Sequence, residues 1–178
     1  MPGPGTPTVF VADEQAEEPV DVARYGRLLE DALAHLDVTG DLEVTLLFVD
    51  TETISELHLQ FMDLPGPTDV LSFPIDEEVA EPGRFPDGGT AGPDREPGDP
   101  DDVPLLLGDI VVCPAVAHRN APEHAGTAGD ELALLVVHGV LHLLGHDHAD
   151  DEQRAAMWAR EREVLDACWG PLARDPWG

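Results

Sequence analysis

Apolar residues dominate one stretch of the chain, 132–144 (LALLVVHGVLHLL), whose only polar side chains are His138 and His142. A run of this length and composition predicts a buried helix rather than a strand. Gly145 follows at the position where a helix commonly ends. Just upstream, Thr127 and Asp130 form a capping arrangement that predicts where the helix begins.

Weaker patterns of the same kind predict the other elements. Runs rich in β-branched and apolar residues predict strands, and apolar residues at helical spacing or after a capping residue predict helices. The expected strands are 8–12, 42–49, 70–75 and 105–112, and the expected helices, besides the one that begins near 127, are 22–36, 54–61, 114–120 and 151–167. Pro74 suits an edge strand or a strand end, and Gly108 interrupts the last strand.

Four strands and about five helices predict an α+β fold, in which helices pack against one mixed sheet. The length of 178 residues suits a single domain, 1–178, and the sequence contains no internal repeat. Residues 1–7 and 170–178 are expected to be loose ends. Residues 76–104 are rich in Pro, Gly and acidic side chains, which predicts a surface loop between two strands.

Charge and cysteine content restrict the functions that the chain can have. Nine basic against 37 acidic residues give a net charge of −28, and every basic residue is Arg. Such a surface repels bulk nucleic acid and anionic membranes. Two isolated cysteines, no signal peptide and no apolar run long enough to span a bilayer predict a cytoplasmic protein with no membrane partner.

The histidines of the apolar helix predict a metal site. Residues four apart lie on one face of a helix, so His138 and His142 are neighbours, and His148 follows after the Gly145 turn. Three protein ligands leave one position for water, as in catalytic zinc sites. His146 is an alternative to His148, and one Zn²⁺ per chain is expected.

The spacing His-x3-His-x2-Gly-x2-His also matches the ligand pattern of metzincin peptidases. Those peptidases carry their general-base Glu immediately after the first His, where this chain has Gly139. The pattern therefore favours a similar metal geometry and disfavours peptide hydrolysis by that mechanism.

Three blocks of sequence resemble the YbeY family of bacterial metal-dependent endoribonucleases. The blocks are HGVLHLLGHDH at His138–His148, PTDVLSFP at Pro67–Pro74 and LGDIVVCP at Leu107–Pro114. The resemblance implies a zincin-like α+β domain with the HxxxH pair on a buried helix, and zinc ligands His138, His142 and His148. It also implies single-strand-specific cleavage of RNA in ribosomal RNA maturation and small-subunit quality control. The implied partners are ribosomal RNA, the small ribosomal subunit and, as a further possibility, ribosomal proteins.

Two features depart from the family pattern. Many members carry an Arg a few residues before the second block, where this chain has Met62, and the acidic segment 76–104 is longer than in compact members. A thioether cannot replace a guanidinium at a phosphate. Both departures concern how RNA is bound rather than how the metal is held.

The leading hypothesis is zinc-assisted hydrolysis of an RNA phosphodiester. Asp147 is a candidate for the general base or for an acceptor behind a ligand His, although a turn-stabilising role explains it equally well. Arg24, Arg27 and Arg119 are available to contact phosphates, and each is also an ordinary surface Arg.

The alternative hypothesis is a ribosome-assembly factor with little or no catalytic activity and a largely structural metal. This hypothesis is supported by the net charge, because an acidic surface is complementary to basic ribosomal proteins. We interpret Ser72, Thr68 and Asp69 as structural rather than nucleophilic. Asp109, within an apolar strand, is expected to be buried and to brace the wall of the site by hydrogen bonds.

Overall fold

The computed structural model of the protein describes residues 7–40, 42–74, 105–146 and 150–177. The elements in chain order are β1 (Thr8–Glu14), α1 (Val22–His35), β2 (Leu42–Val49), α2 (Thr51–Met62), β3 (Val70–Pro74), β4 (Leu105–Val112), α5 (Pro114–Asn120), a 3₁₀ turn (Ala121–Glu123), α6 (Ala128–Leu143) and α7 (Asp151–Cys168). All the expected strands and helices are present, with ends shifted by a few residues at most. Residues 1–6 of the loose end expected at 1–7, and the whole loop expected at 76–104, lie outside the described residues.

The four strands form one mixed sheet in the order β1-β2-β4-β3. β1, β2 and β4 run parallel, and β3 pairs antiparallel with β4 at the edge of the sheet. Pro74 is the last residue of that edge strand, as expected. Gly108 marks a bulge, because Glu43 pairs with Leu106 and Val44 with Gly108, which leaves an extra residue on β4.

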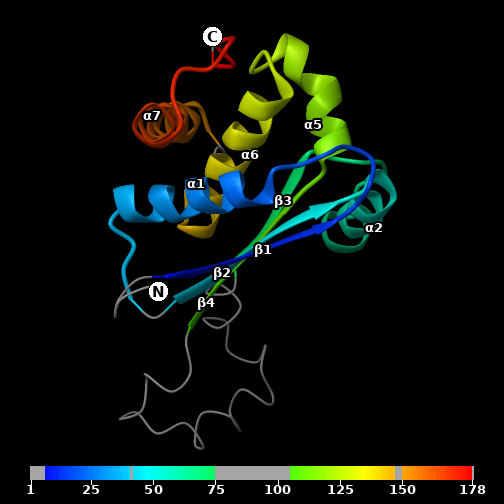
Figure 1. Ribbon diagram of the computed structural model, residues 1–178, viewed down its shortest axis with the longest axis horizontal. Helices are drawn as coiled ribbons and strands as arrows, with labels where there is room; N and C mark the ends of the chain where they lie inside the picture. The colour runs from blue at the N-terminus through cyan, green and yellow to red at the C-terminus, as the bar shows by residue number, and fades with distance from the viewer. Residues whose placement is uncertain (1–6, 41, 75–104, 147–149, 178) are drawn as a thin grey trace, which may run out of the picture.

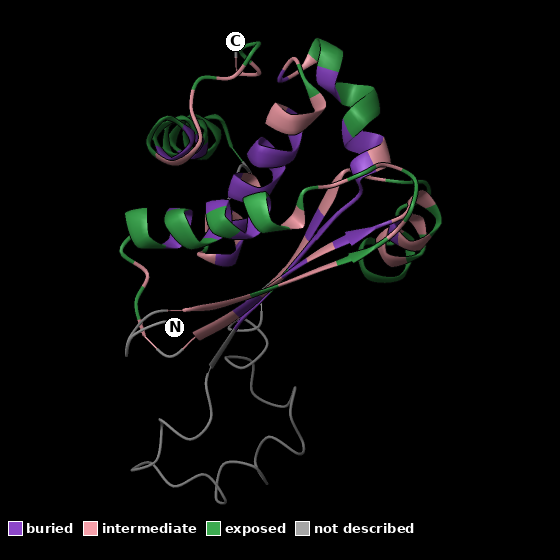
Figure 2. Ribbon diagram, in the orientation of Figure 1, coloured by how far each residue is buried: buried purple, intermediate pink, exposed green. Residues whose placement is uncertain are grey.

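Helices cover both faces of the sheet. Figure 1 shows α1, α6 and α7 on one side of the sheet and α2 on the other. The larger core cluster joins buried residues of α1, α6 and α7 to the strands, and the smaller one includes Ile54 of α2 and Val116 of α5. Burial in Figure 2 follows this plan, with α6 and the central strands buried and the outer faces of α1 and α7 exposed. The expected α+β fold with a mixed four-stranded sheet is confirmed.

The start of α6 holds the C-terminal segment in place. Thr127 caps the helix, because its side chain accepts a hydrogen bond from the Asp130 backbone N–H at 3.1 Å. The Asp130 carboxylate accepts from Trp169 Nε1 at 2.9 Å and from the Ala173 N–H at 2.8 Å. The Arg174 N–H also donates to the Ala125 carbonyl at 2.8 Å. These contacts tie the segment 170–177, which the sequence predicts to be part of a loose end, to the start of α6.

Among the helices that the structure describes, none is both long enough and apolar enough to cross a membrane.

Candidate metal centre

His138 and His142 lie one turn apart on α6 and face each other. Their Nε2 atoms are 3.1 Å apart, and their ring centroids are 4.6 Å apart. Zinc binds histidine nitrogens at 2.0–2.1 Å with tetrahedral geometry, which places two ligand nitrogens about 3.4 Å apart. The observed spacing therefore fits a pair of ligands to one ion.

Glu161 of α7 lies behind this pair and orients His138. Its Oε2 is 2.5 Å from His138 Nδ1, and its Oε1 accepts from Trp177 Nε1 at 2.9 Å. Glu161 is only 2 % exposed. Because a carboxylate can only accept, Nδ1 of His138 carries the proton, and Nε2, which contacts Nε2 of His142, is the nitrogen that a metal would bind. This is the carboxylate–histidine arrangement that accompanies metal ligands in proteins.

Sequence reasoning did not single out Glu161. It lies 23 residues from His138 in the sequence, in an acidic helix where a Glu resembles an ordinary surface residue. One signal was available: α7 follows the histidine segment closely, and a ligand His requires an acceptor from some neighbouring element.

His148 and Asp147 lie outside the described residues, so their predicted roles stay predictions. His146 is described, and its backbone N–H donates to the Leu141 carbonyl at 3.0 Å in the turn after α6. Within the described part of the chain, no group of three His, Cys, Asp or Glu side chains is arranged to hold a metal ion. His148 stays the predicted third ligand, with His146 as the alternative.

Gly139 lies where α6 meets the sheet. A Cβ at this position would be 2.6 Å from Ile110 Cγ2 and 3.3 Å from Ser72 Oγ. Ser72 Oγ also donates to the Gly139 carbonyl at 3.4 Å, so Ser72 ties β3 to α6, as its structural interpretation implied. A side chain at 139 would force Ile110 to shift, so the packing of α6 against the sheet disfavours a Glu at the position where the peptidases carry their general base.

Asp109 does not brace the site, which corrects the expectation. The residue is exposed. Its neighbour Ile110 points toward α6 and would contact a Cβ at position 139, so Asp109 points to the opposite face of the sheet. Desolvation against the strands raises the pKa of its carboxyl, and a hydrogen bond with Thr45 opposes that shift.

The candidate RNA-contacting residues do not gather at the histidines. Arg24 places its guanidinium 4.0 Å from the centre of the Trp169 ring, and Arg27 and Arg119 are exposed on α1 and α5. None of the three is among the residues that line the cavity beside His138. Met62, at the end of α2, is 54 % exposed and equally absent from that lining.

Taken together, these observations define an α+β domain with two facing histidines on its buried helix. Comparison with known proteins adds the family. The family model for endoribonuclease YbeY matches residues 10–168. The chain belongs to the YbeY endoribonuclease family, as the three sequence blocks indicated.

Individual relatives agree with this assignment. The chain is 46 % identical over 154 residues to an endoribonuclease YbeY of Mycolicibacterium vanbaalenii, covering 86 % of this chain and 73 % of the relative. It is 43 % identical over 162 residues to that of Rhodococcus opacus, covering 91 % and 79 %. The solution structure of TM1509 from Thermotoga maritima matches with a TM-score of 0.56 and 27 % identity, covering 92 % of this chain and 90 % of that one.

Proposed function

We propose that the chain is a zinc-dependent endoribonuclease that cleaves single-stranded RNA in ribosomal RNA maturation and small-subunit quality control, in the cytoplasm. Its substrate would be ribosomal RNA on or near the small ribosomal subunit. The observation that carries the proposal is the paired Nε2 atoms of His138 and His142, with Glu161 fixing the ring of His138 from behind. The relatives' name, endoribonuclease, supports the class of reaction.

His138, His142 and His148 would hold one zinc ion. When bound, zinc polarises a phosphoryl oxygen and brings the pKa of a coordinated water toward about 7. Glu161 keeps the proton of His138 on Nδ1, so that Nε2 presents its lone pair. The hydrogen bond from Trp177 Nε1 holds the Glu161 carboxylate in place against the His138 ring. Asp147 remains a candidate for the residue that takes a proton from water.

The metal site is tested by elemental analysis of the purified protein and of three variants, His138→Ala, His142→Ala and His148→Ala. We expect about one zinc per chain in the parent protein and loss of zinc in each variant. His118→Ala is the matched control, because His118 is an exposed His on α5 that pairs with Glu18 at 3.3 Å. Full zinc content in His148→Ala would remove His148 from the proposed ligand set.

The activity is tested by cleavage of single-stranded RNA by the zinc-loaded protein, by His138→Ala and by chelator-treated protein. We expect cleavage by the first alone, and by the His118→Ala control at the parent rate. Cleavage that survives both treatments would come from a contaminating nuclease and would contradict the proposal.

One observation favours a second candidate function. A net charge of −28 suits contact with basic ribosomal proteins better than contact with RNA, as a ribosome-assembly factor with a structural metal would require. That candidate predicts a protein that holds zinc and binds the small subunit but does not cleave RNA. A peptidase using the same histidines is disfavoured, because position 139 is a Gly and Ile110 crowds any side chain there.

A further inference from the structure

A cavity of about 180 Å³ lies beside His138, on the side of Glu161. The polar and aromatic residues of its lining are Asp69, His124, His138, Trp158, Glu161 and Trp177. These residues come from the start of β3, the turn before α6, α6 itself, α7 and the C-terminal segment. The cavity is therefore built from segments that are far apart in the sequence and that meet next to a proposed metal ligand.

Two buried carboxylates fix the walls of this cavity. Glu131, which is fully buried in α6, lies 2.8 Å from His124 Nδ1 through Oε2, and its Oε1 accepts from the Ala125 N–H at 3.1 Å. Glu161, itself in the lining, holds both His138 and the indole of Trp177. Burying a carboxylate is costly unless several hydrogen bonds satisfy it, and here each carboxylate holds a ring at the cavity wall. The cavity is thus preorganised.

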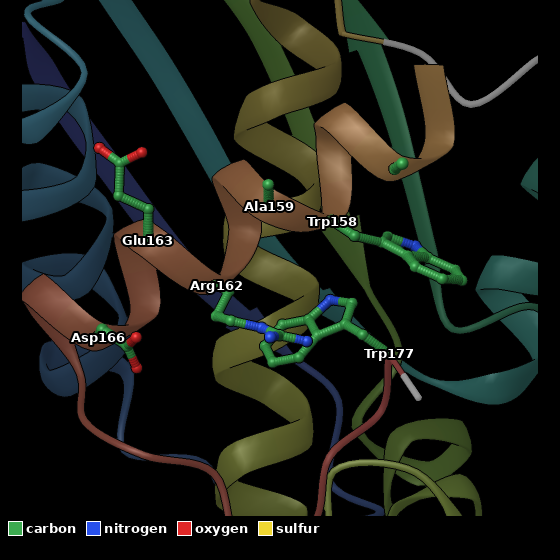
Figure 3. A pocket seen from close by; sticks show the side chains of 7 residues that line it. Trp158, Ala159, Arg162, Glu163, Asp166 and Trp177 are labelled. Carbon is green, nitrogen blue, oxygen red and sulfur yellow. The ribbon is translucent and has the colours of Figure 1, made fainter. Parts of the chain in front are cut away.

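Size and lining suit a flat aromatic ring. An apolar cavity of about 150 Å³ binds benzene, so a cavity of about 180 Å³ has room for a single planar heterocycle. Trp158 is 37 % exposed, which makes it one of the large apolar residues that the fold leaves partly uncovered. In Figure 3 it borders a second, shallower groove along α7, with Trp177 on the other side and Arg162 lying across the Trp177 indole.

The charge of the protein indicates which part of an RNA this cavity can accept. Phosphates are repelled by a surface with 37 acidic residues, and no Arg is among the lining residues of the cavity. A nucleobase is uncharged and is attracted by aromatic faces, with base–aromatic stacking worth about 1–3 kcal/mol per base. In a protein this acidic, base stacking can supply affinity that phosphate contacts do not.

We propose that the cavity is a subsite for one unpaired nucleobase of the RNA, stacked on Trp158 next to the scissile bond. This inference rests on the proposed function, since it takes RNA to be the substrate. A base inside a duplex is stacked on both faces and cannot enter, which gives a physical origin for single-strand specificity. Asp69, also in the lining, offers a carboxylate that can accept from the exocyclic amino group of cytosine, so we expect cytosine to be preferred over uracil.

The test uses fluorescence anisotropy with fluorescein-labelled 12-nucleotide oligo(C), oligo(U) and a duplex of the same length, and a gel confirms intact RNA. We expect Trp158→Ala to weaken oligo(C) binding by about 5- to 150-fold, the equivalent of one lost stack. Trp158→Phe, which keeps a ring, retains most of the affinity. Phe10→Ala is the matched control, because Phe10 is 49 % exposed on β1, at the opposite edge of the sheet. Zinc content stays at the parent level in all three variants.

The outcomes separate this inference from the proposed function. Equal oligo(C) affinity for the parent and Trp158→Ala, or equal parent affinity for the duplex and the single strand, would overturn the nucleobase subsite even if RNA is cleaved. Loss of binding in Trp158→Ala together with no cleavage by the zinc-loaded parent would sustain the subsite and overturn the nuclease. A parent preference for oligo(U) over oligo(C) would overturn the assignment of Asp69.

Discussion

At the scale of single residues, each of the two carboxylate oxygens of Glu161 accepts a hydrogen bond from a different side chain. His138 Nδ1 uses one oxygen and Trp177 Nε1 uses the other. A glutamine at this position has only one acceptor oxygen, so one of the two donors would be left without its partner. The expected consequence is weaker metal binding, because the ring of His138 would lose its fixed orientation.

We therefore expect Glu161→Gln to bind zinc about 10- to 100-fold more weakly than the parent, the usual effect of losing an acceptor behind a metal ligand. Competition with a chromophoric chelator measures the affinity, and circular dichroism confirms that the variant is folded. Glu163→Gln is the control, since Glu163 lies on the same helix but pairs with His35 at the surface. Unchanged zinc affinity in Glu161→Gln would show that the contact does not orient the ligand.

Gly139 is a second single-residue feature with a measurable consequence. Gly139→Ala places a methyl group against the branched side chain of the fully buried Ile110, which has little rotamer freedom to move aside. We expect a loss of about 1–3 kcal/mol in the free energy of unfolding, as for other overpacked cores. Chemical denaturation measures it.

Gly129→Ala is the matched control for this prediction. Gly129 lies on the same helix, and its added Cβ would meet only Tyr25 OH, at an ordinary 3.6 Å. Alanine is also the better helix former, so this variant should be neutral or slightly more stable. Equal stabilities of the two variants would contradict the steric account of position 139.

At the scale of secondary-structure elements, α2 begins at a cap whose strength depends on pH. Asp50 accepts a hydrogen bond from the Thr53 backbone N–H at 2.8 Å. Hydrogen bonds with the side chain and the backbone of Thr53 lower the pKa of Asp50 below its ordinary value of 3.8. A carboxyl whose folded pKa lies below its unfolded pKa stabilises the protein above the unfolded value, and the contribution is lost as pH falls through the folded pKa.

Asp50→Ala should therefore lower Tm at pH 7 and at pH 5, and the difference from the parent should shrink at pH 3. Thermal melts at the three pH values measure the effect. Glu56→Ala, an exposed position on the same helix, should show little difference at any pH. A difference that stays constant down to pH 3 would rule out the ionised carboxylate as the stabilising group.

The elements themselves could be predicted because their signals are local. Caps such as Asp21, Asp50 and Asp150 and the apolar spacing of α1 and α6 act within one or two turns. The anchoring of the C-terminal segment could not be predicted, because Asp130 contacts partners 39 and 43 residues away. The orientation of Asp109 depends on which parts of each sheet face are covered by helices. The composition of the strand alone does not predict that coverage.

The histidine pair shows the same difference between local features, which the sequence predicts, and long-range contacts, which it does not. Spacing placed His138 and His142 on one face of a helix, and the 3.1 Å between their nitrogens agrees with that. The acceptor behind His138 comes from α7, and the nucleobase cavity combines five segments, so neither has a local signature. Candidate ligands that lie on one helix can be predicted from sequence more readily than the residues on other elements that orient them.

At the scale of the whole molecule, net charge determines how RNA affinity responds to salt. Each phosphate neutralised by a basic side chain releases counterions, so the slope of log affinity against log salt reports the number of such contacts. With nine Arg and no Lys in the chain, few phosphates can be neutralised.

We expect a slope with a magnitude of only a few for single-stranded RNA, measured by anisotropy from about 50 to 300 mM NaCl. A slope near ten would indicate an extensive basic groove and would contradict both the charge argument and the emphasis on base stacking. Arg119→Ala should change the slope by at most about one, the effect of a single phosphate contact.

The position of Glu161 and Trp177 downstream of the histidines also sets an order of assembly during synthesis. The ribosome releases α6 before α7 and before the segment that carries Trp177, so a nascent chain exposes His138 and His142 while their orienting carboxylate is still unmade. Such a chain would bind zinc more weakly than the complete protein. If the site binds zinc as proposed, its maturation would wait until translation has passed the last helix, and a stalled fragment that stops short of α7 would be released without the residues that orient His138.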